Sequence, residues 1–235
     1  MTKDPDPEIA RLREEYARRA DDADSDDRYS SANPAFQWIL ATRQRAIIDF
    51  FERFGVFDFS KLRILEMGCG SGGVLEEFID LGSEPVNMFG VDLLWDRLRV
   101  AKYKIENCSW VSADGQNLPF SAETFDLVLQ FTAFSSILNL STKATMAKEM
   151  MRVLKPGKGI LWYDFIWNPL NRQTRGIPIT QVRNLFPGML ITARRITLAP
   201  PISRTLIPEH QRLATALSRI SFLNSHLLVW IQKPG

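Results

Sequence analysis

Residues 64–73, ILEMGCGSGG, join an apolar run to a cluster of glycines. Gly68, Gly70 and Gly73 fit the G-x-G-x-x-G spacing of loops whose backbone approaches the pyrophosphate of a dinucleotide. Glu66 does not suit that ligand, because a carboxylate beside a helix N-terminus would repel a pyrophosphate. The stretch therefore predicts a strand, a tight glycine loop and a helix, and it leaves the ligand of the loop open.

Short apolar runs alternate with helical runs on both sides of the glycine loop. Strands that are apolar throughout, with helical crossovers between them, indicate a parallel sheet that is covered on both faces. We therefore expect an α/β fold with a doubly wound sheet. The expected strands are residues 62–67, 86–92, 109–114, 125–131 and 159–165.

The tail of the chain departs from this alternation. Residues 178–186 and 208–223 have helical patterns, and residues 189–199 and 226–233 have strand patterns. The last strand leaves no room for a further crossover, so we expect it to run antiparallel at or near the edge of the sheet.

Composition sets broad limits on what the chain can be. It has 235 residues, of which 45% are hydrophobic and 24% charged, as in ordinary globular proteins. No window approaches eighteen apolar residues and the N-terminus lacks an apolar signal core, so we expect a cytoplasmic protein without a transmembrane segment. The two cysteines, Cys69 and Cys108, form no C-x-x-C pair, which argues against a metal site or a disulfide framework.

The net charge of +2 conceals an uneven distribution. Residues 21–27, DDADSDD, are acidic, whereas Glu209 is the single acid after Asp164 and stands among eight arginines and one lysine. Two explanations stay open for the basic part: a solvated surface, or side chains that hold an anionic substrate.

Two further acids end predicted strands beside the glycine loop. Asp92 ends the second strand, where its carboxylate can accept from both hydroxyls of a ribose, and Asp114 ends the third, where it can accept from an adenine amino group. Glu66 suits a ligand that carries positive charge. S-adenosylmethionine has an ammonium group, a sulfonium and a ribose, and it has no phosphate.

These residues resemble the class I S-adenosylmethionine-dependent methyltransferases, in particular the small-molecule branch found in bacterial biosynthetic pathways. The resemblance rests on ILEMGCGSGG, GVDLL, SADGQNLPFSAETFDLVLQ and EMMRVLKPGKGILWYD, and it covers about residues 60–165. It implies a Rossmann-like, seven-stranded and mostly parallel sheet with an antiparallel edge strand. It also implies an N-terminal arm with lid helices, residues 1–55, followed by a catalytic domain, residues 56–235.

The resemblance also assigns cofactor-binding residues. Glu66, Gly68, Cys69, Gly70 and Gly72 would line the methionine end, Asp92 and Leu93 the ribose, Asp114 and Gly115 the adenine, and Gln130 and Phe131 the mouth of the site. Cys69 would be a small residue in a tight turn.

Methyl transfer from a sulfonium displaces an activated leaving group, so positioning and exclusion of water supply much of the catalysis. A base is needed only when the acceptor atom still holds its proton. Asp164, at the carboxyl end of the fifth expected strand, is the candidate base, and a cap for the following turn is its alternative role.

The acceptor is expected to be a small, anionic or oxygen-rich metabolite such as a sugar unit, a nucleotide sugar or a prenyl phosphate. Arginine suits a phosphate or carboxylate, and asparagine donates to oxygen-rich groups. The candidate substrate-binding residues are Tyr29, Asn33, Asn168, Asn171, Arg172 and Arg175.

Two other functions stay open. A nucleotide-dependent oxidoreductase or a non-catalytic nucleotide-binding module would use the same glycine loop, but Glu66 and Asp114 count against both. A nucleic-acid methyltransferase is opposed by the near-neutral charge and by QFTA, residues 130–133, in place of an N-P-P-Y or D-P-P-Y tetrapeptide. We therefore expect no nucleic-acid partner. The sequence does not define an oligomeric state.

Overall fold

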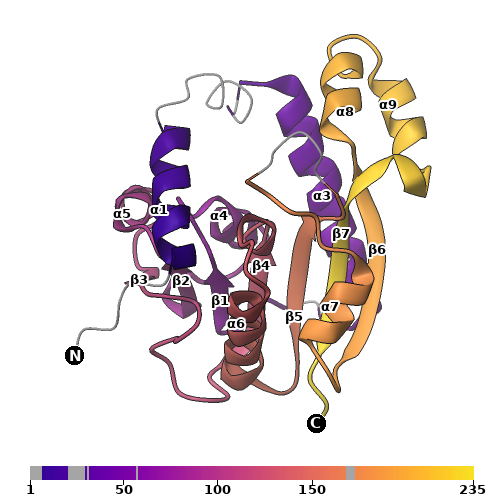
Figure 1. The fold of residues 1–235 in the computed structure, drawn as a ribbon. Coiled ribbons are helices and arrows are strands. Elements are labelled where there is room, and N and C mark those ends of the chain that lie inside the picture. The colour runs from indigo at the N-terminus through magenta and orange to yellow at the C-terminus, as the bar shows by residue number, and fades with distance from the viewer. Residues whose placement is uncertain (1–6, 21–29, 31, 57, 168–172) are drawn as a thin grey trace.

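The computed structural model describes residues 7–20, 30, 32–56, 58–167 and 173–235. One seven-stranded sheet runs through the molecule in the order β3-β2-β1-β4-β5-β7-β6 (Figure 1). The strands are β1 (Ile64–Met67), β2 (Met88–Asp92), β3 (Ser109–Ser112), β4 (Phe125–Phe131), β5 (Leu154–Phe165), β6 (Leu190–Leu198) and β7 (Asn224–Gln232).

Strands β1 to β5 pair in parallel, whereas β7 is antiparallel to both β5 and β6. The expected α/β fold, with a mostly parallel sheet and an antiparallel strand at its edge region, is confirmed. Strand β7 lies one position in from the edge, and β6 therefore points the same way as the parallel strands.

Helices cover both faces of this sheet. Their bounds are α1 (Pro7–Ala20), α3 (Pro34–Arg53), α4 (Gly73–Asp80), α5 (Trp95–Lys104), α6 (Leu140–Val153), α7 (Ile179–Leu185), α8 (Pro200–Leu206) and α9 (Gln211–Ser218). Single 3-10 turns lie at η1 (Pro85–Asn87), η2 (Phe134–Ser136) and η3 (Ser221–Leu223).

Two hydrophobic clusters follow from this arrangement. Helices α6 and α7 pack with Leu65, Val128 and Trp162 on one face. Helices α3 and α4 pack with Ile64 and Leu127 on the other, because neighbouring residues of a strand point to opposite faces. The doubly wound arrangement predicted from the apolar strands is therefore present.

Phe50 and Phe51 of helix α3 belong to the second of these clusters, in which they pack with residues of the sheet. Asn33 starts this helix: its side chain accepts from the amides of Ala35 and Phe36, and Pro34 takes the first helical position. The division of the chain at residue 55 stays a prediction.

The sequence patterns missed helix α8. Pro200 and Pro201 both occupy its first turn, where the backbone N–H groups of a helix have no acceptor within the helix, so proline costs no hydrogen bond there. None of the described helices is both long and apolar enough to cross a membrane.

Candidate active site

The glycine loop between β1 and α4 adopts a conformation that suits glycine at three positions. Gly68, Gly70 and Gly72 have φ values of 75°, 54° and 81°, in the left-handed region. The amides of Gly68 and Cys69 both donate to the carbonyl of Val91 at the end of β2, at 2.8 and 3.0 Å. A Cβ on Gly68 would lie 2.6 Å from the Cβ of Ala133, so the loop packs closely against the chain after β4.

Asp92 is held between the glycine loop and the next helix. One carboxylate oxygen accepts from the amide of Gly70 at 2.8 Å, and the other accepts from the amide of Leu94 at 2.9 Å. The side chain is 7% exposed. Each oxygen keeps a second acceptor position, so the carboxylate is oriented and can still accept from a ligand hydroxyl.

Asp114 lies after β3, where one carboxylate oxygen accepts from the amide of Gln116 at 2.9 Å. A side chain on the next residue, Gly115, would begin 2.7 Å from the Cε of Met146 on α6. The backbone therefore passes close under α6 at this point.

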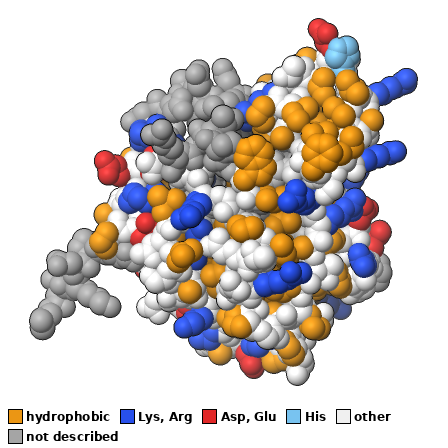
Figure 2. All heavy atoms as spheres, turned by 45° about the vertical axis from the view of Figure 1, so that its right-hand side comes forward, with side chains coloured by type: hydrophobic (Ala, Val, Ile, Leu, Met, Phe, Trp, Pro, Cys, Tyr) orange, Lys and Arg blue, Asp and Glu red, His pale blue; other side chains and the backbone are white. Residues whose placement is uncertain are grey.

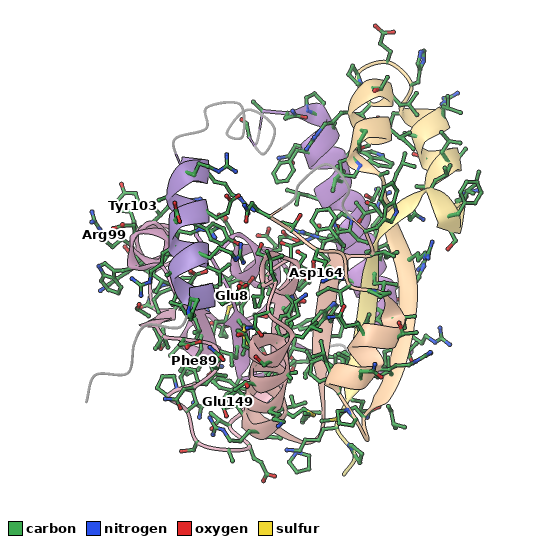
Figure 3. The ribbon with its side chains drawn as sticks, in the orientation of Figure 1. Glu8, Phe89, Arg99, Tyr103, Glu149 and Asp164 are labelled. Carbon is green, nitrogen blue, oxygen red and sulfur yellow. The ribbon has the colours of Figure 1, made fainter. Side chains whose placement is uncertain are left out.

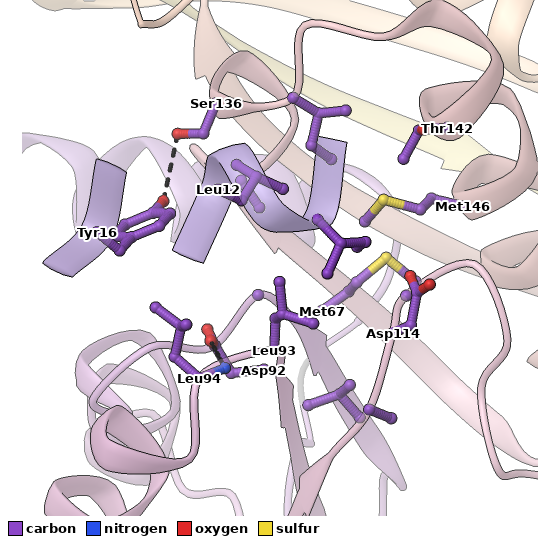
Figure 4. A pocket seen from close by; sticks show the side chains of 17 residues that line it. Leu12, Tyr16, Met67, Asp92, Leu93, Leu94, Asp114, Ser136, Thr142 and Met146 are labelled. Atoms are coloured by element: carbon purple, nitrogen blue, oxygen red, sulfur yellow. Dashed lines mark hydrogen bonds between the residues drawn. The ribbon is translucent and has the colours of Figure 1, made fainter. Parts of the chain in front are cut away.

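A cavity of about 80 Å³ opens between these elements (Figure 4). Gly68, Asp92, Leu93, Asp114 and Gly115, all predicted from the sequence, are among its lining residues. The ends of β1, β2 and β3 thus meet at one space, as expected for the carboxyl edge of a parallel sheet. The remaining lining residues are Ile9, Leu12, Tyr16, Met67, Val91, Leu94, Ala113, Ala133, Ser136, Ile137, Thr142 and Met146.

Helix α1 covers this cavity. The family resemblance implies an N-terminal arm with lid helices, but the sequence patterns did not identify the residues of α1 that line the cavity. Leu12 and Tyr16 face into it, and the Tyr16 hydroxyl donates to the Ser136 Oγ at 3.2 Å (Figure 4). Arg11 donates to the Ser136 carbonyl at 2.6 Å, and the Glu8 carboxylate accepts from the amide of Leu138. Pockets for drug-sized ligands hold roughly 300 Å³ or more, so the cavity, with α1 packed over it, is smaller than such a pocket.

Arg97 of α5 also lies at the glycine loop and was missed. Its guanidinium is 5.0 Å from the centre of the Tyr16 ring, and it occupies the space that a side chain on Gly70 would need. It links α5, the loop and α1 at the rim of the cavity.

Glu66 lies beneath the loop with 1% of its surface exposed, outside the residues that line the cavity. Burial raises its pKa to about 8, and the charges of Glu77 and Asp92 add to the rise. One of its carboxyl oxygens has no hydrogen-bond partner. Burial also raises the pKa of the Cys69 thiol, which keeps this residue protonated and unreactive.

Gln130 and Phe131 at the end of β4 are buried and do not line the cavity. The Gln130 amide nitrogen donates to the Asp164 carboxylate at 2.9 Å, and its amide oxygen has no partner. Phe131 belongs to the cluster beneath α3. Both residues stay predicted cofactor contacts.

Asp164 is 1% exposed at the end of β5, near the centre of the molecule (Figure 3). Besides the Gln130 amide, its carboxylate accepts from the amides of Ser135 and Phe165, at 3.0 and 2.8 Å. Burial raises its pKa, and these hydrogen bonds oppose the rise. The carboxylate thus holds the earlier turn at Ser135; its role as a cap for the turn after β5 and its role as a base both stay predictions.

Lys143 of α6 is a functional candidate that the sequence did not suggest. Its side chain is fully buried and its ammonium nitrogen has no hydrogen-bond partner. Burial lowers its pKa, while the charges of Asp164 and Glu8 act in the opposite direction. A buried amine without a partner is energetically costly, which makes Lys143 a candidate for a functional role.

The candidate substrate residues are less clearly placed. Arg175 is exposed, and its amide donates to the Ser135 carbonyl at 2.7 Å. Asn33 caps α3, as described above. Tyr29, Asn168, Asn171 and Arg172 lie outside the described residues.

The described residues contain no group of three or more histidine, cysteine, aspartate or glutamate side chains that could hold a metal ion. His226 is buried and stacks on Tyr163 with a centroid separation of 4.6 Å. Burial lowers its pKa to about 3, so it stays neutral at physiological pH.

Known proteins share both the motifs and the fold. Residues 64–157 match a family described as a methyltransferase domain. A sterol 4-C-methyltransferase of Caenorhabditis elegans is 34% identical over 108 residues, which are 43% of this chain and 30% of that protein. A ubiquinone/menaquinone biosynthesis C-methyltransferase of Vibrio vulnificus is 28% identical over 119 residues, 47% of this chain and 45% of that protein. The matches thus span less than half the length of these relatives.

The fold is also similar to that of a crystallised S-adenosylmethionine-dependent methyltransferase from Mesorhizobium loti, with a TM-score of 0.57 and 18% identity. That match covers 77% of this chain and 95% of the other. At this level of identity the likeness concerns the fold.

Proposed function

We propose that this chain, whose residues 64–157 match a methyltransferase domain, is a class I S-adenosylmethionine-dependent methyltransferase that transfers a methyl group to a small-molecule acceptor. One observation supports the proposal most strongly. Gly68, Asp92 and Asp114, from three different strand ends, line a single cavity.

S-adenosylmethionine is the cofactor of this domain family, and the residues around the cavity fit its parts. The oriented Asp92 carboxylate, with Leu93, suits the ribose, and Asp114 with Gly115 suits the adenine. A positive group beside Glu66 would lower its raised pKa, and this would convert the buried carboxyl into the acceptor that we propose for the positive end of the ligand. When bound, the cofactor supplies a methyl group on a sulfonium, a good leaving group.

The chain's own contribution is then to orient the acceptor and to exclude water. Helix α1 closes the cavity with Leu12 and Tyr16, and this closure strengthens the electrostatic interactions beneath it. If the acceptor atom carries a proton, we propose Asp164 as the group that removes it, since burial has moved its pKa upward.

For the acceptor we favour a molecule with a lipid-like body and an oxygen-bearing reacting end. The relatives named above modify a sterol or act in ubiquinone and menaquinone biosynthesis. Among the anionic acceptors expected from the sequence, a prenyl phosphate shares the apolar body, and Lys143 with Arg175 suits its oxygens. A sugar unit or a nucleotide sugar lacks that body unless a lipid carries it.

Thermal unfolding with S-adenosylmethionine, S-adenosylhomocysteine or NAD tests the cofactor. A ligand at about 100 times its Kd stabilises the folded state by roughly 2.7 kcal/mol, which is easily measured. We expect S-adenosylmethionine and S-adenosylhomocysteine to stabilise the protein and NAD to have no effect. Stabilisation by NAD alone would refute the proposal.

Release of S-adenosylhomocysteine, measured with a panel of prenyl phosphates, sterols, quinols and nucleotide sugars, tests the acceptor. We expect turnover with a lipid-bodied member of the panel. Turnover confined to nucleotide sugars would support the proposed methyltransferase activity but would exclude a lipid-bodied acceptor.

A further inference from the structure

A second surface of the molecule, outside the cavity, is formed by residues 199–223 between β6 and β7. Strand β6 runs parallel to β5 and ends at Leu198, and β7 begins at Asn224. Helices α8 and α9 therefore lie at the same edge of the sheet as Asp92, Asp114 and Asp164. Figure 1 shows them projecting beyond the sheet at this edge.

The inner side of this segment is firmly attached to the body of the protein. Ile207 and Ala214 pack with Leu198 and with Trp38 of α3 in a separate hydrophobic cluster. The side-chain amide of Asn224 donates to the Ser218 carbonyl at 2.9 Å. The two helices are thus held in place without help from their outer side.

The outer side carries apolar side chains that the protein does not bury. Phe222 is 74% exposed, Leu213 49% and Ile220 39%. Figure 2 shows hydrophobic side chains gathered over this part of the molecule, with basic side chains around them. We call Leu213, Ile220 and Phe222, with Arg212 and Arg219, the α9 face. Side chains of this size contact water only at a cost unless a partner covers them.

The charge around the apolar side chains identifies the kind of partner. Arg212 and Arg219 are exposed, and Glu209 is the one acid between residues 199 and 223. Exposed aromatic and aliphatic side chains with arginines beside them are typical of surfaces that lie in the headgroup region of a bilayer. A second copy fits less well, because a twofold interface would place the same arginines near one another.

We propose that the α9 face binds the surface of a bilayer that contains anionic lipids. Phe222, Leu213 and Ile220 enter the boundary between headgroups and acyl chains, and Arg212 and Arg219 contact the headgroup phosphates. Because this face and the cavity share one edge of the sheet, bound protein holds its active site toward the membrane. The proposal goes beyond the methyl transfer and does not depend on it.

Sedimentation of the full chain with vesicles tests the proposal, and its readout is independent of methyl transfer. Vesicles of phosphatidylcholine with phosphatidylglycerol are compared with vesicles of phosphatidylcholine alone. Two arginines near an anionic surface contribute about tenfold in affinity or more. We expect binding to the anionic vesicles to exceed binding to the neutral ones by at least that factor.

Two variants separate the apolar and the basic contributions. Phe222→Ser with Leu213→Ser should lower binding to anionic vesicles by about tenfold or more, because both side chains lose their contact with the acyl boundary. Arg212→Glu with Arg219→Glu should abolish the preference for anionic lipid. Tyr103→Ser is the matched control: Tyr103 is 91% exposed and lies on α5, on the other side of the molecule (Figure 3).

All three variants change exposed side chains, and thermal unfolding verifies that each is folded. Equal binding of the wild type and the Phe222/Leu213 variant to anionic vesicles would overturn the proposal. So would a dimer, seen by light scattering without lipid, that the same variant abolishes, since a second copy would then occupy the face.

Discussion

The proposed cofactor side of the site, at the ends of β1 to β3, and the proposed acceptor side, around Asp164, differ in how their polar groups are satisfied. On the cofactor side, Asp92 accepts from two backbone amides and Asp114 from one, so both carboxylates are oriented before any ligand arrives. On the acceptor side, the Lys143 amine and the Gln130 amide oxygen are buried without partners.

This difference indicates where ligand binding changes the protein most. Polar groups that are already oriented bind a matching ligand without reorganisation. The proposed cofactor side is therefore selective for one ligand. Buried groups without partners destabilise the free protein and gain their hydrogen bonds when a ligand supplies them. The following changes test this contrast, beginning with the largest expected effect.

Asp92→Ala should remove the two charge-assisted hydrogen bonds that we propose Asp92 makes with the ribose, and it leaves the Gly70 and Leu94 amides without their acceptor. Such bonds contribute about 1.5–3 kcal/mol each, so we expect affinity for S-adenosylmethionine to fall by at least about a hundredfold. Isothermal titration measures it. Asp96→Ala, at an exposed position four residues later, is the control and should bind S-adenosylmethionine normally. Unchanged affinity in the Asp92 variant would show that Asp92 does not bind the ribose.

Lys143→Met replaces a buried amine with an apolar side chain of similar length. We expect the free protein to gain about 1–3 kcal/mol in free energy of unfolding, because an unsatisfied polar group is removed. Turnover of the acceptor should fall in the same variant while cofactor affinity is kept. Lys148→Met, at an exposed position on the same helix, should change neither the free energy of unfolding nor the turnover. A loss of stability in Lys143→Met would show that the buried amine does not destabilise the free protein.

Glu66→Gln should flatten the dependence of stability on pH. Because the folded pKa is about 8 against 4.5 for the free side chain, the folded protein holds an extra proton between these values. The free energy of unfolding therefore falls as pH rises through this window, by about 1.4 kcal/mol per unit from this group. Urea unfolding at several pH values checks the slope, with the exposed Glu76→Gln as control. An unchanged slope in Glu66→Gln would show that Glu66 ionises normally.

Tyr16→Phe removes the hydrogen bond from α1 to Ser136 and keeps the ring that lines the cavity. A hydrogen bond of this kind contributes about 1 kcal/mol, so amide hydrogen exchange in α1 should become roughly five times faster. Tyr103→Phe, on the exposed side of α5, should leave that exchange as it is. Equal protection of α1 in both variants would mean that the bond does not hold the helix.

Much of the cofactor side could be predicted from the sequence because its signals are local. A strand, a glycine loop and a helix follow one another within residues 64–80, and the acids at the next two strand ends follow from the alternation. Asp92 and Asp114 therefore line the cavity as expected.

The acceptor side depends on contacts between distant residues, which no local pattern contains. The bond between Tyr16 and Ser136 spans 120 residues, and the burial of Lys143 results from elements that meet only in the folded protein. Asp164 is an intermediate case: its position at a strand end was predictable, but its contacts with Gln130 and Ser135 were not.

Helix α1 touches both sides at once. Its apolar residues cover the cofactor cavity, while Glu8, Arg11 and Tyr16 bond to the turn at residues 136–138, beside which Asp164 lies. A displacement of α1 that widens the cavity therefore also breaks the hydrogen bonds of this helix to the turn, so the two regions open together.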